Sequence, residues 1–186
     1  MAKITKDMIL DHVLTLLEQK SPDRITVTEI CDGLGINRNT FYYHFADLYE
    51  LLDSLFERED ARFAEEEGAS DITEDYERRV AFLVEHKKAV ENIYHSTHRE
   101  RFTAYLNRLS AEFVDPYVRR ETEGLGLTEE DLRYICGFYE CALEGLVCRW
   151  LERDMPVLSR DVHKRFAESF YATLKGMAES CRKREK

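Results

Sequence analysis

Two consecutive segments carry the strongest structural signal in this chain of 186 residues: Thr26-Val-Thr-Glu-Ile-Cys-Asp-Gly-Leu-Gly35 and Ile36-Asn-Arg-Asn-Thr-Phe-Tyr-Tyr-His-Phe45. The first opens with a Thr and a Glu three residues apart, the spacing of a capping box, which predicts the start of a short helix. Its closing Gly-Leu-Gly predicts the end of that helix, because glycine accepts a positive φ without penalty. Asn37 can then cap a second short helix. Two short helices joined by a glycine-containing turn predict a helix-turn-helix.

The second of these helices is rich in hydrogen-bonding side chains and reads Arg38-Asn-Thr-Phe-Tyr-Tyr-His44. A helix that lies in the DNA major groove reads base edges with residues near its N-terminus. Arginine suits guanine and asparagine suits adenine by bidentate geometry, whereas Thr and Tyr hydroxyls suit phosphates. The segment therefore predicts a DNA recognition helix.

Residues 26–45, followed by Leu51 and Leu52, resemble the TetR family of bacterial one-component repressors. In that family a Thr-Val-x-x-Ile opening, a Gly-Val/Ile turn and a Thr-Phe/Leu-Tyr-x-His/Tyr-Phe recognition helix recur. The specific resemblance covers about the first quarter of the chain. The stretch 37–45 also resembles a branch of the family that includes regulators of dihydroxyacetone kinase genes, some of which act with a partner protein.

The resemblance implies which side chains contact DNA. The family commonly has a lysine that binds a phosphate at the start of the helix after the recognition helix, but Leu48 stands here. One phosphate contact is thereby lost, and other basic groups such as Lys3 and Lys6 would have to replace it. The remaining expected DNA contacts are Thr28 on the first helix of the motif and Arg38, Asn39, Thr40, Tyr42, Tyr43 and His44 on the second.

The charge of the chain leaves a second interpretation open. The formal net charge is −10, and residues 1–50 contain five basic and eight acidic side chains, which gives −3. Binding to a polyanion requires local positive charge. The alternative is therefore a co-regulator that acts through a protein partner and binds DNA weakly or not at all.

The rest of the chain shows helical periodicity with no convincing strand. Only 8 glycines and 3 prolines occur, and 44% of the residues are hydrophobic, which favours a packed helical core. We expect an all-α fold of about nine helices. Residues 1–47 are predicted to form a three-helix module that contains the helix-turn-helix. Residues 48–186 are predicted to form a helical domain for effector binding and dimerisation, as the resemblance implies.

Aromatic side chains are frequent in the middle helices. Buried tyrosines must find hydrogen-bond partners, and many of them in one region suit a cavity with polar groups. His95 and His98 are three residues apart, a spacing that also suits a metal, but we favour histidines that line a pocket and expect neither a metal nor a cofactor. The predicted contacts to a small-molecule effector are Tyr94, His95, His98, Tyr105, Tyr117, Tyr139 and Trp150.

The last two predicted helices favour a homodimer. Apolar side chains occupy more than one face of residues 135–151, which indicates burial on more than one side. Two copies related by twofold symmetry would read a palindromic site in double-stranded DNA.

Several classes of protein are not supported. No catalytic motif rises above chance, so we do not expect an enzyme. The five cysteines include no C-x-x-C pair, which suggests neither a disulfide framework nor a zinc site. No apolar run approaches the ~20 residues that span a bilayer, and the N-terminus does not resemble a signal peptide. We therefore expect a cytoplasmic protein without a membrane partner.

Overall fold

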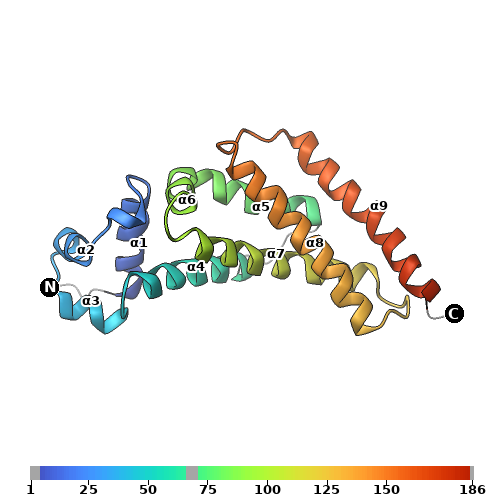
Figure 1. Cartoon of the computed structure of the whole chain (residues 1–186), viewed down its shortest axis with the longest axis horizontal. Coiled ribbons are helices and arrows are strands. Elements are labelled where there is room, and N and C mark those ends of the chain that lie inside the picture. The colour runs from blue at the N-terminus through green and yellow to red at the C-terminus, as the bar shows by residue number, and fades with distance from the viewer. Residues whose placement is uncertain (1–4, 66–70, 185–186) are drawn as a thin grey trace. The chain divides into compact units, whose positions relative to one another are not determined.

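The computed structural model describes residues 5–65 and 71–184. Within these residues the chain forms nine α-helices, a short 3-10 helix at Pro22–Arg24 and no strand, so the predicted all-α fold is confirmed (Figure 1). Among the described helices, none combines the length and the apolar character that crossing a membrane requires. The helices are α1 (Lys6–Leu17), α2 (Val27–Leu34), α3 (Arg38–His44), α4 (Leu48–Glu65), α5 (Ile72–Glu85), α6 (Lys87–Tyr94), α7 (Arg99–Glu121), α8 (Glu129–Leu151) and α9 (Arg160–Arg184).

The chain divides into two compact units. The first contains Met1–Gly68 and Leu83–Thr103, and the second contains Ala69–Phe82 and Ala104–Lys186. The first unit therefore holds the helix-turn-helix, α4 and α6, while the second holds α8, α9 and most of α5 and α7. These units group residues by packing alone, so the functional boundary at residue 47 stays a prediction.

Local capping interactions set four of the helix starts. The side chains of Thr5, Thr26, Asn37 and Thr128 each accept a backbone N–H in the first turn of the helix that follows. Thr128 and Asp131 form a complete capping box.

The predicted capping box at Thr26 is only half formed. Thr26 accepts the N–H of Glu29 at 3.2 Å. The Glu29 carboxylate, however, accepts both of its hydrogen bonds from Nζ of Lys20, at 2.5 and 2.6 Å. A charged partner nine residues earlier thus replaces the backbone N–H that the local pattern predicted.

The turn between α2 and α3 depends on Gly35. Its φ is +63°, in the left-handed region. The N–H of Gly35 donates to the carbonyl of Asp32, and the N–H of Ile36 donates to the carbonyl of Cys31 at 2.9 Å. This pair of hydrogen bonds is a Schellman motif, which satisfies the last carbonyls of α2 and turns the chain into α3.

The core of the first unit joins α3 to α1, α2 and α4. Phe41 and Phe45 are 0% and 1% exposed, and their ring centroids lie 5.7 Å apart. Ile9, Ile30 and Leu51 are each fully buried in the same unit. Since α3 has only seven residues, its two buried phenylalanines hold it in place.

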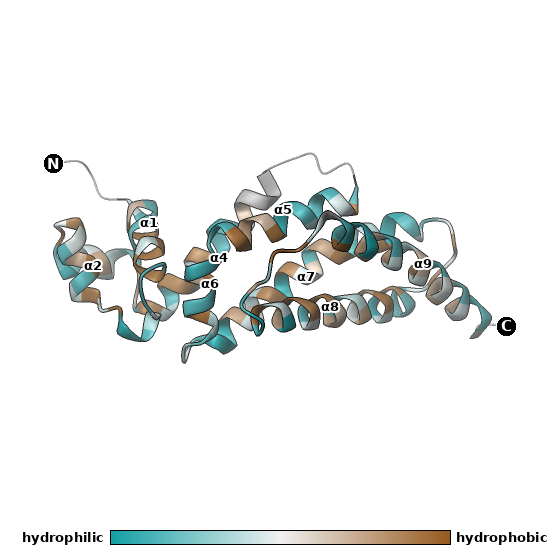
Figure 2. Ribbon diagram, turned by 90° about the horizontal axis from the view of Figure 1, so that it is seen from above, coloured by the Kyte–Doolittle hydropathy of each residue, from teal (hydrophilic) through white to brown (hydrophobic). Residues whose placement is uncertain are grey.

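The second unit is built from amphipathic helices. Figure 2 shows hydrophobic and hydrophilic residues alternating along α7 and α8, as expected for helices with one buried side. Tyr139 of α8 packs against Phe170 of α9 with ring centroids 4.7 Å apart. Tyr76 of α5 stacks on Phe166 of α9 at 4.3 Å with 17° between the ring planes.

A buried polar pair connects α5 and α7 in this unit. The Tyr117 hydroxyl lies 3.4 Å from a carboxylate oxygen of Asp75, and both residues are 7% exposed. Asp75 also forms ion pairs with Arg78 and Arg79. Burial of the phenol and the neighbouring negative charge of Asp75 raise the pKa of Tyr117 to about 12.

We predict that Gly35→Ala lowers the free energy of unfolding by about 1 kcal/mol, because residues other than glycine are disfavoured in the left-handed region. Gly176→Ala is the matched control. Gly176 lies in α9 with no atom within 4 Å of an added Cβ, so alanine there should stabilise by about 0.5–1 kcal/mol. Denaturant unfolding of the three proteins measures both shifts. Equal stability of Gly35→Ala and wild type would contradict this account of the turn.

We predict that Tyr117 makes stability fall at high pH. Its pKa is raised in the folded protein, so its contribution is fully present below about pH 10, the ordinary value for tyrosine, and is lost as the pH rises through about 12. Tyr117→Phe should therefore flatten the pH dependence of the unfolding free energy over that window. The measurement is denaturant unfolding at a series of alkaline pH values. An unchanged slope in the variant would mean that ionisation of Tyr117 is not linked to folding.

Candidate functional site

Helix α3 presents polar side chains outward and apolar ones inward. Its N-cap Asn37 accepts the N–H of Thr40 at 2.9 Å. Arg38 and Asn39, in the first turn, are exposed. Further along the helix, Tyr42 is 52% and Tyr43 is 84% exposed. The helix thus offers hydrogen-bonding groups to solvent at its N-terminal end, where a recognition helix meets base edges.

Arg38 is tied to the preceding helix. Its guanidinium donates to the Thr28 hydroxyl at 2.5 Å. Both side chains are exposed and both are predicted DNA contacts. The structure therefore brings together the guanidinium that suits a guanine and the hydroxyl that suits a phosphate.

The other predicted contacts of α3 are less accessible. Thr40 is half-buried, and its hydroxyl lies within hydrogen-bond distance of the Asn37 side chain, at 3.2 Å. His44 is also half-buried, and its ring packs edge-on against Tyr43 with centroids 5.0 Å apart. Of the two predicted N-terminal lysines, Lys6 is exposed and its ammonium lies 5.5 Å from the centroid of the Phe45 ring. Lys3 lies outside the described residues.

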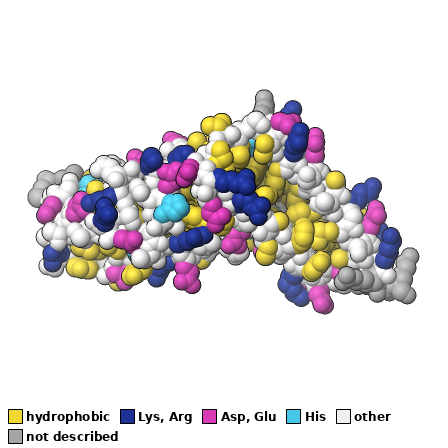
Figure 3. Space-filling view, turned by 45° about the horizontal axis from the view of Figure 1, so that its top comes forward, with side chains coloured by type: hydrophobic (Ala, Val, Ile, Leu, Met, Phe, Trp, Pro, Cys, Tyr) yellow, Lys and Arg dark blue, Asp and Glu magenta, His cyan; other side chains and the backbone are white. Residues whose placement is uncertain are grey.

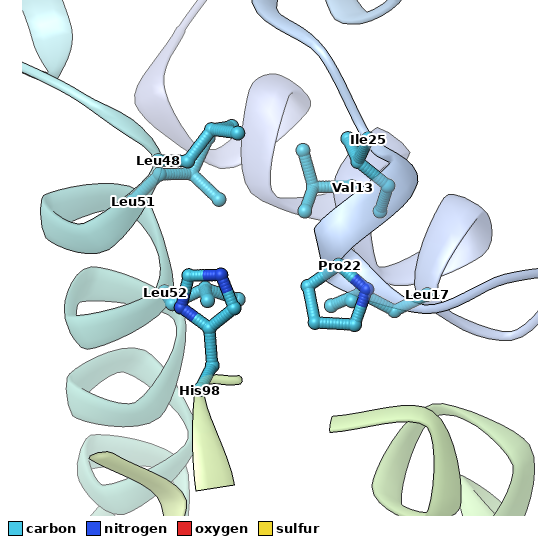
Figure 4. A pocket seen from close by; sticks show the side chains of 8 residues that line it. All are labelled: Val13, Leu17, Pro22, Ile25, Leu48, Leu51, Leu52 and His98. Carbon is cyan, nitrogen blue, oxygen red and sulfur yellow. The ribbon is translucent and has the colours of Figure 1, made fainter. Parts of the chain in front are cut away.

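Leu48 has a packing role. The side chains of α4 face Val13, Leu17, Pro22 and Ile25 across a cavity of only about 10 Å³, and His98 lies beside it (Figure 4). Such a space holds at most one water molecule and no effector. Where the family commonly has a phosphate-binding lysine, this chain has an apolar side chain that lines the interior of the first unit.

Long-range hydrogen bonds tie the three-helix module to α6 and to the residues just before α7. Asn92 of α6 donates to the carbonyl of Leu17 at 2.7 Å. The Thr97 hydroxyl donates to the Asp23 carboxylate at 2.5 Å, and this bond lowers the pKa of Asp23 below its usual value. His98 is buried, with Nε2 3.7 Å from the same carboxylate. These contacts join residues about 75 positions apart within one unit.

The predicted effector contacts are divided between the two units. Tyr94, His95 and His98 belong to the first unit, and the other four belong to the second. Tyr94 is fully buried and accepts a hydrogen bond from Arg99 at 2.6 Å, whereas His95 is exposed.

The tyrosines of the second unit are also buried. Tyr105 is 3% exposed. The Tyr117 hydroxyl is near Asp75, and the Tyr139 hydroxyl is 2.7 Å from the hydroxyl of Thr173. These tyrosines pack in the core, and of the seven predicted contacts only Trp150 lines the larger cavity described below.

The histidine pair is not assembled into a metal site by the described part of the chain. Across residues 5–65 and 71–184, no group of three or more His, Cys, Asp or Glu side chains could hold a metal ion. His98 instead packs against Tyr49, with ring centroids 4.9 Å apart.

A cavity of about 330 Å³ lies between α5, α8 and α9 in the second unit. Tyr76, Trp150 and Phe166 contribute aromatic walls, and Arg165 and Ser169 contribute polar groups. The volume falls at the lower end of the range of about 300–1,000 Å³ that is usual for ligand sites. The cavity can therefore hold a small molecule.

Most of the side chains that line this cavity were not predicted from the sequence. Four of the residues, Val162, Arg165, Phe166 and Ser169, recur at the i, i+3, i+4 and i+7 positions of α9. That spacing marks one helix face. It does not distinguish a face that lines a cavity from one that packs in a core, so only the packing of α5 and α8 identifies the site.

Two family models match this chain. Residues 9–55 match the model described as "Bacterial regulatory proteins, tetR family". Residues 70–172 match a TetR model described as "Transcriptional regulator C-terminal region". The second match alone covers more than half of the 186 residues.

Curated relatives match over a short stretch of the chain. The tetracycline repressor proteins class D of Escherichia coli and class H of Photobacterium damsela subsp. piscicida are each 33% identical over 55 residues, which is 30% of this chain. The match spans 25% of the length of these relatives.

Solved structures are similar over nearly the whole chain. The dihydroxyacetone kinase operon activator DhaS aligns with a TM-score of 0.73 over 92% of this chain and 97% of its own. The fatty acid degradation regulator FadR from Bacillus halodurans aligns with a TM-score of 0.61 over 96% and 95%. Both are 17% identical to this chain, so they are similar in fold alone. Because the family models match both the helix-turn-helix and the helical region after it, the chain belongs to the TetR family of transcriptional regulators.

Proposed function

We propose that this protein binds a palindromic operator in double-stranded DNA as a homodimer and represses transcription until a small-molecule effector releases it. The observation that carries the proposal is the exposed first turn of α3. Arg38 and Asn39 are free to approach base edges there, and Thr28 lies within hydrogen-bond distance of Arg38. A DNA regulator works where the DNA is, which agrees with the predicted cytoplasmic location.

The homodimer is supported by a stripe of exposed side chains on α8. Tyr134 is 60% exposed and Phe138 is 52% exposed, whereas Leu146, also 52% exposed, lines the cavity beside α9. Cys141 and Gly145 are exposed and continue the helical spacing that begins at Tyr134 and Phe138. Large exposed apolar patches mark interaction sites, and Figure 3 shows hydrophobic side chains gathered on the surface of this unit. The apolar side of α9, in contrast, is largely buried within the unit, so α8 is the better candidate for the interface.

The names of the relatives differ in the direction of regulation. The matching curated relatives are repressors by name, whereas DhaS is an activator by name. We propose repression because the repressors are 33% identical to this chain over the matched 55 residues, whereas DhaS is 17% identical. Release by an effector requires a ligand that binds the two conformational states with different affinity, typically worth 1–3 kcal/mol.

The alternative is a co-regulator that acts through a protein partner. It is favoured by Leu48, which lines the interior where the family commonly has a phosphate-binding lysine. The acidic balance of residues 1–50 favours it as well. DNA-binding measurements separate the two functions.

We predict sequence-specific DNA binding that depends on Arg38. Arg38→Ala should cost on the order of 1–3 kcal/mol on the selected site and relax the preference at one base pair. Among the described residues, Lys6 and Arg38 are the predicted DNA contacts that carry a positive charge. With two such contacts per protomer, and so four per dimer, the plot of log K against log salt should have a slope of about −4, which is shallow for a repressor. Random-site selection followed by gel-shift titration measures both quantities.

Arg24→Ala is the matched control. Arg24 is exposed in the 3-10 helix, outside the helix-turn-helix. Its loss removes the same charge, so it should leave the base preference unchanged. If selection yields no preferred sequence for the wild-type protein, the repressor is excluded and the co-regulator is favoured.

We predict that Gly145→Trp dissociates the dimer. Nothing lies within 4 Å of a Cβ added at Gly145, so the protomer accepts the change, while a partner packed on the stripe would clash with it. Gly176→Trp on α9, which also meets open space, is the control and should stay dimeric. Sedimentation at micromolar concentration reads the oligomeric state. A monomeric wild type would exclude the homodimer, and a dimeric Gly145→Trp would place the interface elsewhere.

A further inference from the structure

The cavity in the second unit has walls from three helices. Tyr76 and Val80 come from α5, Trp150 from α8, and Val162 and Phe166 from α9. Val162, Phe166 and Ser169 lie on the same face of α9, and Tyr76 and Val80 are one turn apart on α5. The walls are therefore apolar and rest on regular secondary structure.

The aromatic walls present mainly flat ring surfaces to a ligand. The indole N–H of Trp150 donates to the carbonyl of Pro156 at 2.8 Å, so its hydrogen bond is already made. The rings of Tyr76 and Phe166 stack at 4.3 Å, and Phe113 packs behind Phe166 at 6.2 Å. Flat apolar surfaces of this kind favour an apolar body over a strongly hydrated one.

Arg165 is the positively charged side chain that lines this mainly apolar cavity. Arg165 lines the cavity and pairs with Asp161 one turn earlier at 2.8 Å, and both side chains are largely exposed, at 75% and 68%. An exposed pair of this kind contributes little to stability. A carboxylate brought by a ligand can therefore replace Asp161 and form a bidentate pair with the guanidinium.

We infer that this cavity binds the effector of the proposed regulator, and that the effector is an anionic amphiphile: an apolar body between the aromatic walls and one carboxylate on Arg165. A cationic ligand would meet Arg165, and among the described residues that line the cavity there is no acidic side chain to receive it. A neutral ligand of the same body would bind more weakly, since it leaves the Arg165 contact unused. That the ligand acts as an effector rests on the proposed function, whereas its binding to this cavity does not.

The experiment uses three probes of equal chain length: decanoate, 1-decanol and decyltrimethylammonium, each below its micelle concentration. Trp150 is the only tryptophan of the chain, so its fluorescence reports occupancy of the cavity. Isothermal calorimetry on the same full-length protein gives the stoichiometry. We expect saturable quenching by decanoate at one site per protomer, weaker binding of the alcohol and the weakest binding of the cation.

Arg165→Gln should weaken decanoate binding by about tenfold and leave 1-decanol unchanged. Lys164→Gln is the matched control, because Lys164 is the exposed neighbour on α9, carries the same charge and does not line the cavity. Ser169→Phe, at an exposed position on the cavity wall, fills the space and should abolish binding of both probes. Circular dichroism of each variant confirms that the helices are intact.

The outcomes separate the alternatives. Equal loss in Arg165→Gln and Lys164→Gln, or tighter binding of the cationic probe, would overturn the anionic class. Undiminished binding to Ser169→Phe would place the ligand elsewhere, and a cavity closed by a second copy would show as decanoate affinity that falls as protein concentration rises. Gel shifts with and without decanoate then test the coupling. If the protein binds no DNA with or without decanoate, the proposed function is excluded but the ligand site is not. If the protein binds DNA but not decanoate, the ligand site is excluded but the proposed function is not.

Discussion

A helix of seven residues cannot stay folded alone in water, because too few hydrogen bonds offset the cost of nucleation. Helix α3 exists only because Phe41 and Phe45 are buried in the core of the first unit. The rest of the candidate interface depends on that burial. Because one side of α3 is buried, Arg38 and Tyr42 point to solvent. The positive φ of Gly35 turns the chain between α2 and α3 so that Arg38 can donate to Thr28.

The polar contacts around Asp23 extend this rigid arrangement beyond the three-helix module. Thr97 donates to Asp23 through both its hydroxyl and its backbone N–H, and Arg101 of α7 pairs with Asp53 of α4 at 2.5 Å. Thr97 thus attaches the residues just before α7 to the three-helix module, and Arg101 attaches the first turn of α7 to α4, all within one unit. A rearrangement of this turn must break or remake those bonds, so it is a physical element through which a change could reach α3.

The sequence predicted what local interactions determine. The predicted caps at Thr26 and Asn37 involve partners three residues away, and the structure contains both of these hydrogen bonds. The sequence could not separate pocket residues from core residues, because tyrosine serves equally well in a core and in a pocket. The Tyr94 hydroxyl has a hydrogen-bond partner in Arg99, and the Tyr139 hydroxyl has one in Thr173. Amino-acid composition does not reveal such partners. The cation at the cavity, Arg165, gave no signal in the sequence because one exposed arginine on a helix is ordinary.

The acidity of the N-terminal region bears less on DNA binding than its formal charge suggests. Of the eight acidic side chains before residue 51, most have defined partners inside the first unit. The Asp11 and Glu29 carboxylates are neutralised locally by a cationic partner, and those at a helix N-terminus interact with its positive dipole end, so neither kind opposes a phosphate as an isolated charge would. The charges that act most directly against DNA at the exposed side of the motif are then few, and Asp32 of α2 is exposed among them. The acidic side chains with partners are Asp11 with Arg58, Glu18 with His86, Asp23 with Thr97, Glu29 with Lys20, and Asp47 and Glu50 at the start of α4.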